Sequence, residues 1–311
     1  MNSSGYRQVS ERAANWVSAN LAQFEYHPDH DRTLTARLKA LSELAIAAEV
    51  LLQHRREDVW FEKKSKEWLS FCWSQLNEGN ILRQVIDRRA DFLLFAAMYL
   101  PFMRNGMRNE QLEQAIRDGL RNRGASSHEF QGWVLLLIVR TLHLLEIESP
   151  WTIDSCFRDT WLHNLPEPWS IRNESAYSLT HTVFFLTDFG QRPDHLPEVY
   201  RQYLVLWLPV WLEHYRTSWN HDLLAEMIIV ARCIHVEDEN DWGSILLSRQ
   251  EKDGTLRKPR MQQTGPNEVK DVRKQFQEKY HSTLAVLMAS VMSLDDSARV
   301  ALAKTVADPV S

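Results

Sequence analysis

The sequence predicts an all-α protein whose helical hairpins close into a ring, an (α/α)6 toroid. Apolar residues recur at the spacing of helices and almost nowhere alternate as they do in strands. Only 10 Gly and 11 Pro occur in 311 residues, too few for the many tight turns of an all-β fold. Segments that are apolar on every side alternate along the chain with segments that carry one charged face. Such alternation is typical of two layers of helices.

The inner layer is predicted from six segments that are apolar nearly all round, because a helix without a polar face is buried on every side. These segments are 41–52, 91–100, 133–145, 177–186, 223–234 and 282–292. Their centres lie 48, 42, 46, 45 and 58 residues apart along the chain. A nearly constant period of this length is typical of stacked supersecondary units.

The outer layer is predicted from amphipathic segments that lie between the apolar ones. These segments are 6–24, 60–76, 109–120, 154–165, 197–215 and 241–250. An open solenoid would also alternate two kinds of helix, but its inner helices should keep a polar face, which these barely have. The pattern therefore favours a closed ring. We expect a single domain over 1–311, in which the charged segment 251–276 is a loop, either a lid or a solvated segment.

Composition limits the classes of partner and the compartment. The net charge is −5 and the isoelectric point is near 6.2, which favours neither nucleic acid nor an anionic membrane as partner. No apolar run approaches the roughly 20 residues that span a bilayer. Cys72, Cys156 and Cys233 are odd in number and far apart, as expected of reduced thiols in a cytoplasm. The sequence makes no prediction of oligomeric state.

Two short stretches carry resemblances. The stretch LLSRQEKDGTL at 246–256 resembles the Gln-x-x-Asp-Gly turn of terpene cyclases, in one copy and with Leu256 where an aromatic residue is usual. Those cyclases belong to the α/α-toroid superfamily with lanthionine cyclases, several glycosidases and polysaccharide lyases. The Thr-Asp-Phe-Gly stretch at 187–190 resembles uncharacterised bacterial proteins, some of them associated with natural-product genes. The resemblances imply a bacterial protein of toroid fold and leave its activity open.

The stretch 175–190 carries an unusual polar stripe. Tyr177, Thr180, His181, Thr187 and Asp188 fall on one side of the helix, and no Lys, Arg or Glu joins them. We expect the stripe to line a cavity inside the ring, with His181 as a general base. The alternative is that each polar group is a solvated or satisfied residue. For Asp188, a bond to the backbone or to another side chain is the better interpretation.

Further candidates lie where the inner helices begin. Inner helices of a toroid run in one direction, so their amino-terminal ends meet at one mouth. Asp222 and Glu226 are four residues apart and share a helix face, so that two carboxylates there could divide acid and base roles. The predicted catalytic residues are His181, Glu226 and His281. The predicted substrate-binding residues are Tyr177, Asp222, His221, Trp169, Trp219 and His128.

No cofactor and no metal site are predicted, because neither HExxH nor CxxC spacing occurs. Zinc is the minor alternative, since His181, His221, His281 and Cys233 are suitable ligand types. The sequence therefore favours an enzyme that acts by acid/base chemistry on a small molecule or peptide in a central cavity. The resemblance of residues 187–190 suggests natural-product biosynthesis as its setting. Transferase, lyase and cyclase are not separated. A non-catalytic ligand-binding or scaffold protein is the alternative, and a glycosidase would need two carboxylates facing each other about 5–10 Å apart.

Overall fold

The computed structural model describes residues 3–26, 34–89, 91–122, 124, 127–236, 241–256 and 272–294. Within these ranges the chain forms helices joined by loops, with no strand and one isolated bridge between Gln250 and Leu256. The predicted all-α class is confirmed. No described helix is both long enough and apolar enough to span a membrane.

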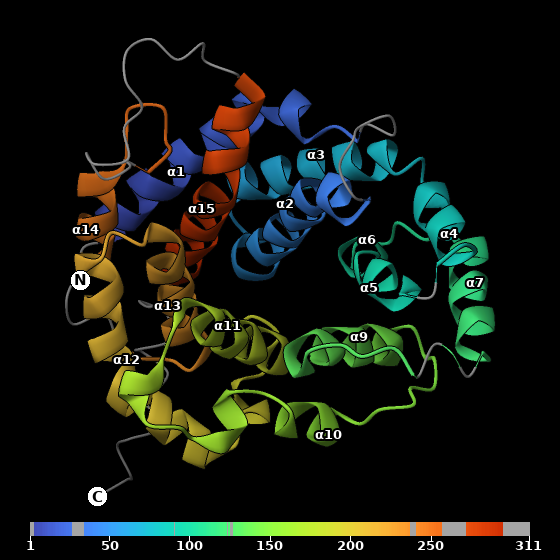
Figure 1. Ribbon diagram of the computed structural model, residues 1–311. Helices are drawn as coiled ribbons and strands as arrows, with labels where there is room; N and C mark the ends of the chain where they lie inside the picture. Colours follow the sequence, from blue (N-terminus) through green and yellow to red (C-terminus); the bar gives the residue numbers. More distant parts are fainter. Residues whose placement is uncertain are drawn as a thin grey trace, which may run out of the picture.

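Helices from the predicted inner segments pack against one another in cyclic order. They are α2 (Leu34–Arg55), α5 (Phe92–Ala97), α6 (Leu100–Arg104), α9 (Gly132–Leu144), α11 (Asn173–Thr187), α13 (His221–Cys233) and α15 (Val272–Ser293). Contacts run from α2 to α15, α13, α11, α9 and α5, and α6 returns to α2 (Figure 1). Helix α15, the last that the structure describes, therefore lies between α2 and α13.

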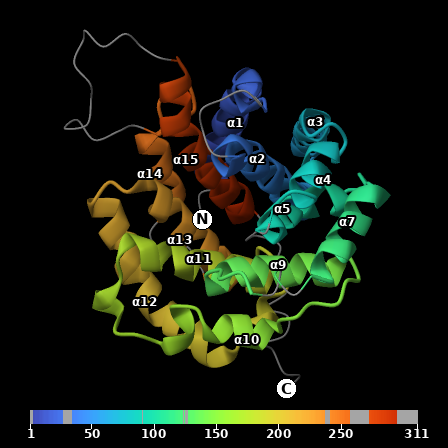
Figure 2. The ribbon, with the colours of Figure 1, turned by 45° about the vertical axis from the view of Figure 1, so that its right-hand side comes forward.

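Helices from the amphipathic segments, together with one short helix that was not predicted, cover this group from outside. They are α1 (Ser3–Ala19), α3 (Val59–Gln75), α4 (Asn80–Ile86), α7 (Glu110–Leu120), α10 (Ile153–Arg158), α12 (Glu198–Thr217) and α14 (Trp242–Arg249). Short 3-10 helices connect them: η1 (Leu21–Phe24), η2 (Leu162–Asn164), η3 (Pro168–Ser170) and η4 (Pro193–His195). Helix α1 packs on α15, α3 on α2, α10 on α9 and α12 on α13 (Figure 2). Charged faces thus point to solvent while apolar faces meet the inner helices.

Side-chain caps fix where several helices begin. Asp58 accepts hydrogen bonds from the backbone amides of residues 60 and 61, and Asn109 caps α7 in the same way. Asn220 accepts from the amide of Leu223 at 3.2 Å and so sets the first turn of α13. That start places Asp222 and Glu226 on successive turns of one helix.

Two predicted boundaries are wrong. The segment 91–100 is not one helix: α5 ends at Ala97, and α6 restarts with Pro101 in its first turn, where a missing amide hydrogen costs nothing. The predicted loop 251–276 ends earlier, because α15 begins at Val272. Phe276 holds this early part of α15, stacking on Trp16 with ring centroids 5.9 Å apart. Residues 257–271 of the predicted loop lie outside the described residues.

Candidate active site

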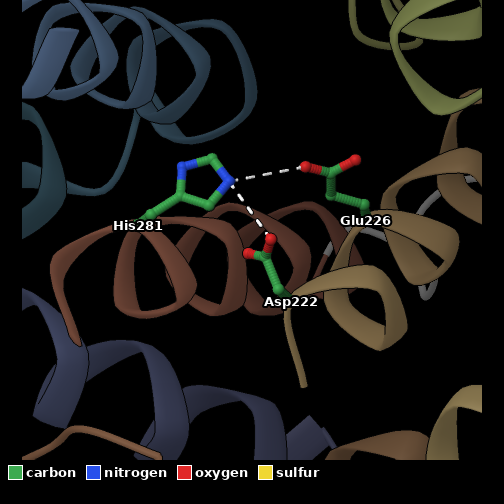
Figure 3. A group of neighbouring side chains, drawn as sticks. All are labelled: Asp222, Glu226 and His281. Carbon is green, nitrogen blue, oxygen red and sulfur yellow. Dashed lines mark ion pairs between the residues drawn. The ribbon is translucent and has the colours of Figure 1, made fainter. Parts of the chain in front are cut away.

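Five predicted residues from three adjacent helices converge. Tyr177 and His181 come from α11, Asp222 and Glu226 from α13, and His281 from α15. The Nε2 atom of His281 lies 3.3 Å from Asp222 Oδ2 and 3.7 Å from Glu226 Oε1 (Figure 3). The Tyr177 hydroxyl donates a hydrogen bond of 2.6 Å to the same Asp222 oxygen. We call these five residues the imidazole–carboxylate cluster.

Glu226 joins the two histidines of the cluster. Its side chain is 4% exposed, and Oε2 accepts a hydrogen bond of 2.5 Å from the Thr180 hydroxyl. The same oxygen lies 3.7 Å from Nδ1 of His181, while Oε1 faces His281. A buried carboxylate needs such partners to offset its lost hydration. Glu226 is therefore more buried than the two imidazoles and lies 3.7 Å from a ring nitrogen of each.

Glu43 of α2 completes the surroundings of His281, and sequence reasoning missed it. Its Oε2 lies 2.9 Å from Nδ1 of His281, opposite the side that faces Asp222 and Glu226. The signal was present in the sequence: Glu43, like Glu226, is a glutamate inside a largely apolar segment, which in the case of Glu43 also contains Glu49. Such a glutamate requires a cationic or donor partner within the fold.

The electrostatics of the cluster follow from these contacts. Burial opposes the charged form of His281, but the charge of Glu43 and hydrogen bonds to three carboxylates raise its pKa to about 12. Burial also opposes ionisation of Asp222, but the hydrogen bond and charge of His281 outweigh it and lower the pKa of Asp222. Burial, followed by the negative charge of Asp222, raises the pKa of Tyr177. At neutral pH the cluster thus combines an imidazolium, ionised Asp222 and a neutral phenol.

His181 is arranged differently. Its Nδ1 lies 2.8 Å from the backbone carbonyl of Tyr177, which can only accept, so Nδ1 carries the hydrogen. In the neutral ring Nε2 is then the atom with a free lone pair. The ring lies against Trp133, with centroids 4.7 Å apart. The side chains of His181 and His281 are 25% and 33% exposed, so a ligand from solvent can reach both.

The comparison with protein families places the chain. Residues 10–291 match the model of a family described as a domain of unknown function, DUF6895. The chain belongs to this family. No curated protein and no solved structure matches the chain. The description of the family therefore indicates no activity for its members.

The remaining predicted binding residues make different contacts. His221 is buried, with Nδ1 3.4 Å from an Arg249 nitrogen, and the Arg249 guanidinium lies 4.7 Å from the Trp219 ring centre. Trp169 on η3 is 79% exposed, and the exposed His128 packs its ring on Phe130. Entry-loop position therefore led to His281, a residue of the cluster, but also to His221, Trp169, Trp219 and His128, which lie outside it.

The lower part of the polar stripe serves another purpose. Asp188 accepts hydrogen bonds from both terminal nitrogens of Arg104, at 3.0 and 2.5 Å, and from Arg140. The Thr187 hydroxyl donates to the backbone of its own helix. The stripe thus divides: Tyr177 and His181 belong to the cluster and Thr180 donates to its Glu226, whereas Asp188 pairs with arginines.

Within the described residues, one group of side chains could hold a metal ion. The ligand atoms of Asp222, Glu226 and His281 all lie within 4.8 Å of one another. Carboxylate and imidazole suit a divalent transition metal, but the ion would have to displace the Nε2 proton that His281 shares with two carboxylates. Cys233 lies twelve residues beyond His221 on α13, about 18 Å along the axis, so the two could not bind one zinc.

Proposed function

We propose that this protein is an enzyme that moves protons on a small molecule or peptide bound over the imidazole–carboxylate cluster. The observation that carries the proposal is the arrangement of two solvent-reachable imidazoles around one buried carboxylate, Glu226. Groups of this kind, held in fixed orientation at a partly exposed site, are typical of acid/base catalysis.

The residues divide the work as follows. Nε2 of His181 takes a proton from the substrate, because its other nitrogen is committed to a backbone carbonyl. His281, as an imidazolium, stabilises the negative charge that develops when the proton leaves. Glu226 is a positioning residue that orients both rings, and Tyr177 is a neutral donor. A lyase, a cyclase or a transferase could use these steps.

We also propose the (α/α)6 toroid as the architecture that holds the site. The cyclic order of contacts among the inner helices supports it. We further propose a bacterial, cytoplasmic protein of natural-product biosynthesis. The resemblance of residues 187–190 supports the bacterial origin and the biosynthetic role. Three buried cysteines without disulfides support the cytoplasm, since they are usual in reducing compartments.

The test uses His181→Ala and a matched variant, His214→Ala, which removes an exposed histidine from the outer helix α12. Wild type and both variants are incubated with a library of metabolites and short peptides, and mass changes are recorded. We expect the wild type and His214→Ala to convert at least one compound. His181→Ala should convert the same compound at least about a hundredfold more slowly. Equal conversion by His181→Ala would remove His181 from the mechanism. Circular dichroism checks that both variants fold.

A non-catalytic ligand-binding protein is the second candidate. One observation favours it: a pKa of about 12 suits His281 to a fixed positive charge better than to proton transfer near neutral pH. This candidate predicts that a compound from the same library binds unchanged, and that Glu226→Gln weakens its binding. Conversion of the bound compound would rule this candidate out.

A further inference from the structure

A second polar site lies towards the carboxyl-terminal ends of α9 and α11. It is a pocket of about 310 Å³, the size that holds a small organic molecule. Its charged lining residues are Arg104, Arg140, Arg192 and Asp188. Asp188 follows His181 by seven residues, about 10 Å along the helix axis, so this pocket is separate from the imidazole–carboxylate cluster.

Positive charge exceeds negative charge in the pocket lining. Asp188 is its one carboxylate and pairs with Arg104 and Arg140, while Glu49, outside the lining, pairs with Arg104 at 2.7 Å. Two carboxylates therefore face three guanidinium groups. Arg192 is exposed at the rim, and its guanidinium forms no ion pair with the described residues. Burial, together with the charges of Arg104 and Arg192, lowers the pKa of Arg140 to about 10. An anion placed between these guanidinium groups would relieve their mutual repulsion.

The pocket also has apolar lining residues. Leu136 and Phe185 are buried, and Ile153 at the start of α10 is 37% exposed. A guanidinium group presents paired donors that match the oxygens of a carboxylate or phosphate. The pocket thus offers donors for a charged head and a wall for a hydrocarbon body.

We propose that this pocket binds a small organic anion, with its carboxylate or phosphate head on Arg192 and Arg140 and its apolar body against Phe185 and Leu136. The inference is independent of the proposed enzymatic function, because it uses none of the residues of the imidazole–carboxylate cluster. The two sites would then bind different ligands.

Calorimetric titration of the full chain tests the proposal with three probes of similar size. Phenyl phosphate and phenylacetate carry the two candidate head groups, and benzyl alcohol is the uncharged control. We expect at least one anion to bind at least tenfold more tightly than benzyl alcohol, and its affinity to fall as salt is added. The stronger of the two anions identifies the head group.

Arg192→Gln should weaken anion binding by about tenfold or more, since one hydrogen bond to a charged group is worth about 1.5–3 kcal/mol. Its exposed, unpaired position makes a folding defect unexpected, and circular dichroism checks this. Arg121→Gln, which removes a surface arginine of α7's carboxyl end, should bind like the wild type. The proposal is overturned if neither anion binds better than benzyl alcohol, or if Arg192→Gln binds as tightly as the wild type.

Discussion

Replacing Asp188 by asparagine should strongly destabilise the protein. The Asp188 side chain is 9% exposed, and it accepts hydrogen bonds from Arg104, from Arg140 and, at 3.4 Å, from Gln53. Its backbone is left-handed, with φ +52°, a conformation that asparagine tolerates as well as aspartate does. Asp188→Asn therefore removes the charge and leaves the turn at the end of α11 possible.

The expected loss is about 3–5 kcal/mol in the free energy of unfolding. Asparagine retains one oxygen, while its amide nitrogen is placed against the Arg104 nitrogen that lies 2.5 Å from Asp188. The hydrogen bond from that nitrogen is lost, which costs about 1.5–3 kcal/mol, and the bonds from Arg104 and Arg140 to the remaining oxygen lose the charge of their acceptor. Arg140, only 13% exposed, then remains charged without its carboxylate. Removing one partner of a buried ion pair costs about 3–5 kcal/mol in other proteins, and this range sets the expected loss.

Urea unfolding of the full chain, followed by circular dichroism, measures the loss. Asp118→Asn is the matched control, because its partner Arg121 is 78% exposed and a surface pair contributes about 1 kcal/mol or less. Adding Arg140→Met to Asp188→Asn should restore part of the stability, since the unpaired buried charge is then absent. The reasoning fails if Asp188→Asn costs no more than Asp118→Asn.

Three further predictions concern other parts of the molecule. The pKa of His281 is raised from 6.5 to about 12, so the stability that protonated His281 contributes is complete below about pH 6.5 and declines as pH rises towards 12. The difference in unfolding free energy between wild type and His281→Gln should therefore shrink from about pH 6 to 10, and a constant difference would contradict this. Gly254→Ala should lower the free energy of unfolding by at least about 2 kcal/mol, because φ is +95° and the new Cβ would lie 2.2 Å from the Arg12 carbonyl oxygen. Gly106→Ala, where φ is +79° and no atom lies near the new Cβ, should lower it less in the same denaturation assay. The three buried cysteines should react with a thiol reagent only as fast as the protein unfolds, and rapid labelling of the native protein would show that one is accessible.

The sequence predicted the helices well because the inner segments are apolar on every side, a pattern that a layer of fully buried helices requires. Boundaries failed where a local cause outweighed that pattern. Pro101 divides one predicted helix into α5 and α6, and the Phe276 contact extends α15 beyond its apolar part. The short helix α4 was not predicted, since its seven residues are too few for a clear periodicity.

The cluster could be predicted only in part. Tyr177 and His181 share a helix face, and Asp222 and Glu226 share another, so helical spacing identified each pair. That the two pairs meet His281 depended on the order in which the helices pack. Glu43 was missed for the same reason: its partner is 238 residues away in the chain. Entry-loop position, the argument used for Trp169 and His128, carries no information about where a side chain points.

The place of α15 between α2 and α13 has a consequence for synthesis on the ribosome. Asp222 and Glu226 leave the ribosome well before His281, the cation that both carboxylates face. A nascent chain that ends before α15 therefore holds two carboxylates on α13 and Glu43 on α2 without this counter-ion. Repulsion between Glu43 and the two carboxylates of α13 should oppose the approach of α2 to α13 until α15 is translated and inserts between them. The imidazole–carboxylate cluster would then form only when α15, the last helix that the structure describes, joins the fold.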